Sequence, residues 1–244
     1  MRRHLLMLLC LSLLLVANTA LAGKTVSVTR IDNPDPQVYT MGGATRSDCQ
    51  VGNLNDPAWL IGDWVWGEEG YKYLFHPQTS CSCPIGFQLE TIHMLMDFGV
   101  EDVPVTFEAY VDLEEAVWDD LLGCYYPGPE TCVSPVYQFT IDTAGTYDIA
   151  MSIFDHCDCA YMNYNYFLSF HFVTTFDSAM LPSLVSDEFP VGCTSWNDYG
   201  FGWQDLVNDF GWPGELMMWA DVVCCEFPVG TENGTWGEVK TMYR

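Results

Sequence analysis

The chain has 244 residues, of which 33 are Asp or Glu and 8 are Lys or Arg, so its formal net charge is −25. No Lys or Arg occurs from Tyr73 to Val239, a stretch that contains 26 acidic residues. Because such a surface repels polyanions, this charge pattern excludes DNA, RNA and anionic lipid as partners of the main body of the protein.

The first 22 residues have the pattern of a signal peptide. Residues 2–4 are basic and residues 5–16 form an apolar run. Ala20 and Ala22 then supply the small residues that signal peptidase requires before Gly23. The alternative is a membrane anchor, but the apolar run is too short to cross about 30 Å of hydrocarbon, and no later segment is long and apolar enough. We therefore predict cleavage before Gly23, no membrane span, and a secreted protein that is extracellular or periplasmic.

Alternation of apolar and polar residues predicts strands along most of the remaining chain. The expected strands are residues 25–29, 64–66 and 71–75 (the last two as an aromatic hairpin), 89–98, 105–111, 136–141, 147–153, 166–173 and 216–223. Strand 166–173 is apolar on both faces, so it should be central in its sheet, with His171 as a hydrogen-bonded core residue. Helical periodicity is poor, and Leu113 to Leu122 is the main candidate for a short helix.

These segments predict an all-β fold, an antiparallel two-sheet sandwich of the jelly-roll type. Residues 23–228 contain no internal repeat and no linker, so they are predicted to form a single domain. Residues 229–244 differ from this body, because Thr235 and Glu238 match a capping box that begins a short helix. So short a helix is unstable alone in water, and the tail from Trp236 to Arg244 is expected to dock on its own domain or on a partner.

Cysteines supply the predicted cross-links. Ten follow the signal peptide: Cys49, Cys81, Cys83, Cys124, Cys132, Cys157, Cys159, Cys193, Cys224 and Cys225. An even number in an exported chain predicts a disulfide framework. Adjacent cysteines such as Cys224 and Cys225 do not easily bridge each other without strain, so the three closely spaced pairs should reach other elements. Cys124 and Cys132 flank a loop containing Pro and Gly, and they are predicted to form a local bridge.

Two metal sites are alternatives to be weighed. A zinc site would use the residues Cys81, Cys83, His156, Cys157 and Cys159, but export and the C-x-C spacing favour disulfides. A structural calcium is a second hypothesis, because loops of secreted sandwiches often supply oxygen ligands. Its candidate ligands are Asp97, Glu101, Asp102, Asp119, Asp120, Asp155, Asp158, Asn197, Asp198 and Asp205, none of which forms a D-x-D-x-D-G loop.

Alternate residues of the strand near 105–111 form an acidic row. Glu108, Tyr110, Asp112 and Glu114 are expected on one outward face. Carboxylates about 5 to 9 Å apart are the groups that glycoside hydrolysis requires, so this row is a candidate hydrolase site. A solvated sheet face is the interpretation that we favour. No G-x-S-x-G, H-E-x-x-H or phosphate-binding glycine loop occurs in the sequence.

Aromatic residues near the C-terminal end suggest a ligand. The segment from residue 194 to residue 212 is rich in Gly and polar residues, which predicts partial exposure of its aromatic rings. Candidate ligand-binding residues are Trp196, Asn197, Tyr199, Trp203 and Trp212. Flat rings stack on sugars while amides and carboxylates bond the hydroxyl groups, so the predicted ligand is a glycan. For the tryptophans themselves, the interpretation that we favour is that they pack against the disulfides.

A general resemblance supports this interpretation. The segments Gly86-Phe87, Val103 to Tyr110, Tyr166 to Leu168, Gly202-Trp203 and Trp219 to Val222 together resemble the uncharacterised, secreted jelly-roll modules of environmental bacteria. The resemblance covers most of residues 60–226. It implies a β-sandwich and a carbohydrate-binding or accessory role, and it supplies no catalytic residues.

The sequence thus predicts a non-catalytic module, extracellular or on the cell surface, that binds a glycan or another cell-envelope component. The alternative is a secreted glycan-active hydrolase that uses carboxylates near Glu108 to Glu114, and a third hypothesis is a subunit of a surface polymer. A cleft with two convergent carboxylates would favour the hydrolase. A flat face with an exposed tryptophan would favour the binding module.

Overall fold

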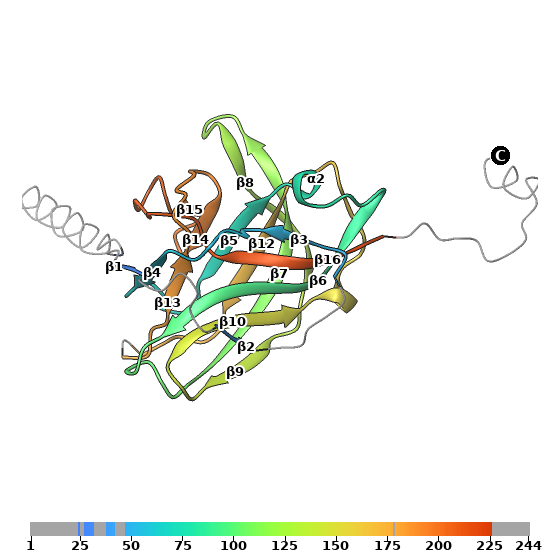
Figure 1. Cartoon of the computed structure of the whole chain (residues 1–244). Helices are drawn as coiled ribbons and strands as arrows, with labels where there is room; N and C mark the ends of the chain where they lie inside the picture. The colour runs from blue at the N-terminus through green and yellow to red at the C-terminus, as the bar shows by residue number, and fades with distance from the viewer. Residues whose placement is uncertain (1–23, 25–26, 32–37, 42–46, 178, 226–244) are drawn as a thin grey trace, which may run out of the picture.

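The computed structural model describes residues 24, 27–31, 38–41, 47–177 and 179–225. These residues form two β-sheets that pack face to face, which confirms the predicted all-β sandwich (Figure 1). Pairing is antiparallel except between β2 and β10, which run parallel. The predicted signal peptide and the predicted C-terminal helix lie outside the described residues.

Among the described residues, the larger sheet has nine strands and the smaller sheet has seven. The larger sheet contains β1 (Ser27–Arg30), β2 (Val38–Met41), β3 (Cys49–Gly52), β4 (Trp59–Gly62), β6 (Gly86–Phe98), β10 (Gly145–Ser152), β11 (Ala160–Tyr161), β13 (Ser183–Ser186) and β16 (Met218–Cys224). The smaller sheet contains β5 (Gly70–Phe75), β7 (Val105–Asp119), β8 (Cys124–Val133), β9 (Tyr137–Ile141), β12 (Tyr166–Phe172), β14 (Ser195–Asp198) and β15 (Gln204–Asp205). Two short helices, α2 (Pro77–Ser80) and η1 (Phe154–His156), complete the described elements.

The core lies between the sheets, where alternate residues of each strand point inward. On β6, Met94 and Phe98 are buried, and on β7 Phe107 is buried. The Phe107 ring lies 6.1 Å from Phe98 of the opposite sheet and 5.8 Å from Phe172 of β12. As predicted, β12 is a central strand, between β5 and β7.

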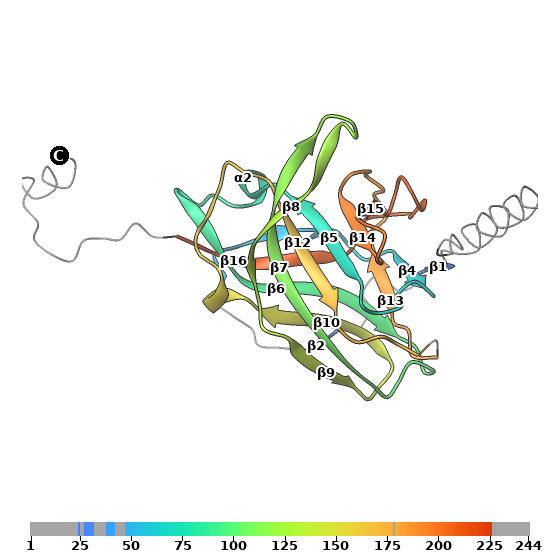
Figure 2. The ribbon, with the colours of Figure 1, turned by 180° about the vertical axis from the view of Figure 1, so that it is seen from behind.

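The predicted helix from Leu113 to Leu122 is wrong, because β7 continues as a strand to Asp119. Strand β7 pairs with β12 up to Glu115 and with β8 up to Asp119, its last residue. The chain then turns where the Asp119 carboxylate accepts hydrogen bonds from the Leu121 and Leu122 amides, at 2.7 and 3.0 Å. The β7–β8 hairpin extends past the rest of the sandwich (Figure 2). Pairing on two sides therefore outweighs the weak helical pattern.

The predicted aromatic hairpin is half right. β5 forms as expected, but residues 64–66 form a loop instead of the first arm. Asp63 and Glu68 adopt positive φ values of 55° and 53°, which interrupts an extended chain on both sides of these tryptophans. The Trp64 ring is instead buried in the core, with Trp212 at 5.3 Å.

All ten cysteines that follow the predicted signal peptide form disulfides, and the closely spaced pairs reach other elements as predicted. The bridges are Cys49–Cys81, Cys83–Cys224, Cys124–Cys193, Cys132–Cys157 and Cys159–Cys225. The predicted local bridge between Cys124 and Cys132 is wrong. Both residues belong to β8. Eight steps along a strand separate them by roughly 26 Å at ~3.3 Å per residue, far beyond the reach of a disulfide.

Candidate functional site

The structure describes all five of the predicted ligand-binding residues. The side chains of Trp196, Asn197 and Trp212 are buried, with exposed fractions of 3, 0 and 2%. Tyr199 and Trp203 are half-buried. The expected partial exposure is therefore wrong for Trp196 and Trp212.

Packing against other rings explains the burial of the two tryptophans, and Trp196 also clusters with the Cys124–Cys193 disulfide, as the packing interpretation predicts. Trp196 belongs to a small apolar cluster on the outer side of the smaller sheet, where Tyr126 packs edge-on at 5.3 Å. Trp212 instead packs in the main core. Neither ring is available to a ligand, so only Tyr199 and Trp203 of the predicted set reach the surface.

Trp203 borders a pocket of about 470 Å³ over the smaller sheet. The pocket is also lined by Tyr110, His171 and Asp198. The Tyr110 and His171 rings stack on each other at 4.6 Å. Beneath Trp203, the Lys72 ammonium lies 3.9 Å from the centroid of the indole ring. This ring therefore covers a charged cluster on the sheet.

The acidic row is part of that cluster, and the prediction that it is a solvated face is wrong for two members. Asp112 and Glu114 are only 1 and 8% exposed. Asp112 Oδ2 lies 2.7 Å from His171 Nε2, and Glu114 forms an ion pair with Lys72. The physical reason is the register, because Ser169 of β12 lies directly between Lys72 of β5 and Asp112 of β7. Asp112 thus has its basic partner His171 on the adjacent strand β12, and Glu114 has Lys72 on β5, one strand farther across the sheet.

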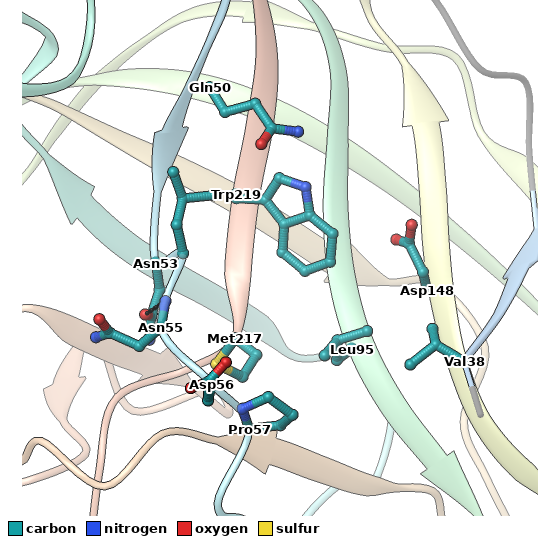
Figure 3. A pocket seen from close by; sticks show the side chains of 11 residues that line it. Val38, Gln50, Asn53, Asn55, Asp56, Pro57, Leu95, Asp148, Met217 and Trp219 are labelled. Carbon is teal, nitrogen blue, oxygen red and sulfur yellow. Dashed lines mark hydrogen bonds between the residues drawn. The ribbon is translucent and has the colours of Figure 1, made fainter. Parts of the chain in front are cut away.

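A groove of about 390 Å³ lies on the outer face of the larger sheet (Figure 3). Trp219 of β16 points into it, with Leu95 of β6 and Asp148 of β10 farther across the sheet. The edge nearest β3 is polar. Side chains on that edge are Gln50, Asn53, Asn55 and Asp56. Asn53 and Asp148 are 1 and 7% exposed and bond to Asp187 and His93, so the exposed hydrogen-bonding side chains of the groove are those of Gln50, Asn55 and Asp56.

His93 fixes the aromatic part of the groove. Its ring stacks on Trp219 with centroids 4.9 Å apart and an interplanar angle of 7°. Its two nitrogens lie 3.0 Å from Asp148 and 3.3 Å from Asp221. Burial lowers the pKa of His93, but the hydrogen bonds and charges of Asp148 and Asp221 together raise it above the usual value. The histidine and its two carboxylates therefore hold the indole ring in place.

Trp219 was not among the predicted site residues, although the sequence carries a signal for it. Met217, Trp219 and Asp221 alternate with the inward-facing Ala220 and Val222. That alternation places Trp219 on the outer face. The sequence prediction for residues 216–223 is a strand without assigned faces, so it does not single out the outward tryptophan.

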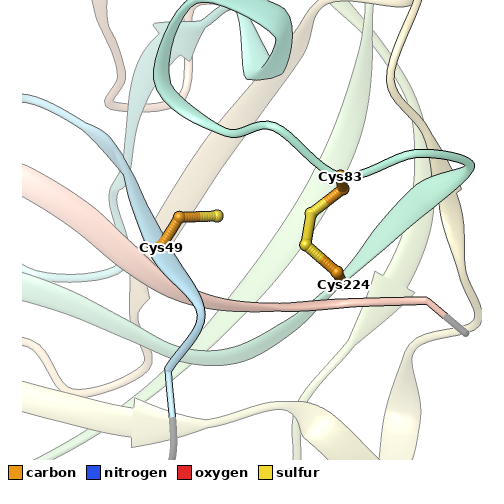
Figure 4. A group of neighbouring side chains, drawn as sticks. All are labelled: Cys49, Cys83 and Cys224. Atoms are coloured by element: carbon orange, nitrogen blue, oxygen red, sulfur yellow. A yellow bond between two sulfur atoms is a disulfide. The ribbon is translucent and has the colours of Figure 1, made fainter.

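The proposed metal sites receive no support from the side-chain arrangement. Within the described ranges, one group of three candidate ligands converges, with the sulfurs of Cys49, Cys83 and Cys224 within 4.8 Å of one another. Figure 4 shows the Cys83–Cys224 disulfide beside Cys49, which is bonded to Cys81. All four cysteines of the zinc alternative are also in disulfides, so that alternative is wrong. The structural calcium stays a hypothesis with unassigned ligands.

The fold places this chain among disulfide-linked β-sandwich proteins. Residues 51–222 match the model of a family described as Domain of unknown function (DUF7451), and the chain belongs to that family. A search of curated proteins and a search of solved structures found no match. In the described part of the chain, no helix has the length and apolar character needed to cross a membrane.

Proposed function

We propose that this protein is a non-catalytic glycan-binding module that acts outside the cell or on its surface. The observation that carries the proposal is the Trp219 groove on the larger sheet. Its volume of about 390 Å³ falls within the range of small-ligand sites. The indole ring of Trp219 offers a flat apolar surface, and the exposed side chains of Gln50, Asn55 and Asp56 offer the hydrogen-bonding groups that a sugar requires.

The charge of the protein and the compartment proposed for it restrict the class of ligand. A net charge of −25 disfavours anionic glycans, so the ligand of the groove is a neutral glycan. Export is supported by the signal-peptide pattern of residues 1–22 and by the five disulfides, which persist in an oxidising compartment. The cell envelope is where such a module would meet its ligand.

The hydrolase alternative has weaker support. Its carboxylates Asp112 and Glu114 are buried and engaged by His171 and Lys72. A general acid and a nucleophile in glycoside hydrolysis must both reach the sugar. Trp203 lies over Lys72 of this cluster, so we favour a structural role for these charges.

Replacing Trp219 by alanine is expected to weaken glycan binding by about tenfold or more, because the stacking surface is lost. The mature protein is first screened on a glycan array, with and without calcium. Soluble neutral oligosaccharides of the classes that bind are then titrated against the wild type and W219A.

W118A is the matched control, because Trp118 is an exposed tryptophan on the β7–β8 hairpin of the other sheet. It should bind as the wild type does. An array without any bound glycan, or equal weakening by W118A and W219A, would contradict the proposal. A requirement for calcium on the array would support the structural calcium.

A further inference from the structure

A second recognition feature surrounds the side chain of Lys24. This side chain is fully buried, and its ammonium nitrogen lies over four aromatic rings. The distances from Nζ to the ring centroids are 4.8 Å for Trp64, 5.3 Å for Trp66, 5.9 Å for Tyr71 and 5.1 Å for Tyr199. We call these four rings the ammonium cage.

Glu69 provides the negative charge of the cage. Its Oε2 lies 2.5 Å from Lys24 Nζ, and the Asn197 amide oxygen accepts a second bond from Nζ at 3.3 Å. The Glu69 carboxylate is also held by two residues whose rings form the cage. The Trp66 amide donates to Oε1 at 3.1 Å, and the Tyr71 hydroxyl donates to Oε2. The anion is therefore positioned by bonds that do not involve Lys24.

This geometry is that of a cation-binding site. Aromatic faces attract ammonium groups, most strongly where water is excluded. Burial lowers the pKa of Lys24 to about 8 against the opposing effect of Glu69, as expected for an ammonium group held away from water. Arg30 shows that the acidic chain does not arrange every cation in this way. It packs on the single ring of Trp59, and its ion pair with Glu188 is about half-exposed.

The cage and its occupant come from different parts of the chain. The four rings, Glu69 and Asn197 all lie within residues 51–222, the segment that matches the family model, whereas Lys24 precedes it. Trp66 is 46% exposed, so one wall of the cage is in contact with solvent. We propose that the domain carries an alkylammonium-binding site, that Lys24 is its resident ligand, and that the emptied site binds a primary alkylammonium ion from solution.

Removal of the lysine side chain tests the proposal. K24A should melt roughly 6 to 12 °C below the wild type, because Glu69 stays buried without its cation. Excess n-butylammonium chloride, which replaces the missing side chain, should then raise the melting temperature of K24A by several degrees above a sodium chloride control of equal ionic strength. n-Butanol has a similar chain without the charge and should give no such rise.

Two variants define the site. R30A removes a cation from an exposed single-ring contact, and n-butylammonium should not stabilise it. In K24A/W66A the cage has lost its exposed wall. The rise in melting temperature caused by n-butylammonium should therefore be less than half of the rise seen in K24A. Absence of any rise in K24A, or an equal rise in R30A, would overturn the proposal.

A labelling experiment covers the case in which K24A does not fold. The wild type is exposed briefly to an amine-acylating reagent, and labelling of Lys24 is read by peptide mass spectrometry against the denatured, disulfide-intact chain. Lys24 should be labelled at least tenfold more slowly in the native protein, and E69Q should reduce that protection. Equal labelling of native and denatured Lys24 would show that the cage does not hold the lysine.

Discussion

E114Q is expected to lower the free energy of unfolding by about 3 to 5 kcal/mol, the usual loss when one partner of a buried ion pair is removed. The Lys72 side chain is 1% exposed, and its ammonium pairs with Glu114 beneath the Trp203 ring. Without Glu114, a cation stays in a region where water does not reach it. Urea unfolding with the disulfides intact measures the effect.

A double variant distinguishes two effects: the loss of the ion pair itself, and the cost of leaving the Lys72 charge buried without a partner. K72M/E114L replaces both groups by apolar side chains. Its free energy of unfolding should lie within about 2 kcal/mol of the wild-type value and well above the value for E114Q. E188Q is the matched control, because its partner Arg30 is half-exposed, and it should change stability by less than about 1 kcal/mol. If E114Q and E188Q are equally mild, the buried pair does not contribute as the structure indicates.

Glu215 is expected to make the protein less stable as the pH rises from about 4.5 to about 8. Burial is the main cause, and with the charges of Asp187 and Asp205 it raises the pKa of Glu215 from 4.5 to about 8. Between these values the native carboxyl is protonated while the unfolded one is ionised. The native state therefore binds the extra proton, and its stabilisation is complete below pH 4.5 and is lost by about pH 8.

The size of this effect follows from the shift. A difference of about 3.5 pKa units corresponds to roughly 4 to 5 kcal/mol. E215Q is permanently neutral, so its free energy of unfolding, relative to that of the wild type, should rise by that amount across the window. Urea unfolding at several pH values measures it. E115Q, which removes an exposed carboxylate of β7, should differ from the wild type by a nearly constant amount. A flat difference for E215Q would show that Glu215 is ionised in the native protein.

Local patterns were sufficient to predict most of the fold. The alternation in residues 89–98 and 105–111 gave strands that belong to β6 and β7, and the apolar run at residues 166–173 gave the central strand β12. These patterns report only which side of a strand is buried. The partners of each strand depend on contacts between distant segments. The cysteine pairs and the extension of β7 to Asp119 therefore could not be read from the sequence.

The candidate sites show the same limit. An outward direction for Asp112 and Glu114 follows from alternation. Their burial depends on His171 of the adjacent strand β12 and on Lys72 of β5, the strand beyond it, and this order of strands comes from long-range pairing. The composition of the segment from residue 194 to residue 212 predicts a binding site for an external glycan. Two of its members, Asn197 and Tyr199, contact Lys24 of the same chain. Aromatic and amide side chains that suggest a site for an external ligand therefore also serve to hold a side chain of the same protein.

The disulfide network has a consequence for proteolysis. The Cys83–Cys224 bridge joins residues 141 positions apart, so any single peptide-bond cleavage between them leaves both fragments covalently attached. Leu121, at the tip of the β7–β8 hairpin, is 97% exposed, and exposed loop tips are preferred sites of proteolytic cleavage. A molecule nicked there stays in one piece on a non-reducing gel and separates only after reduction.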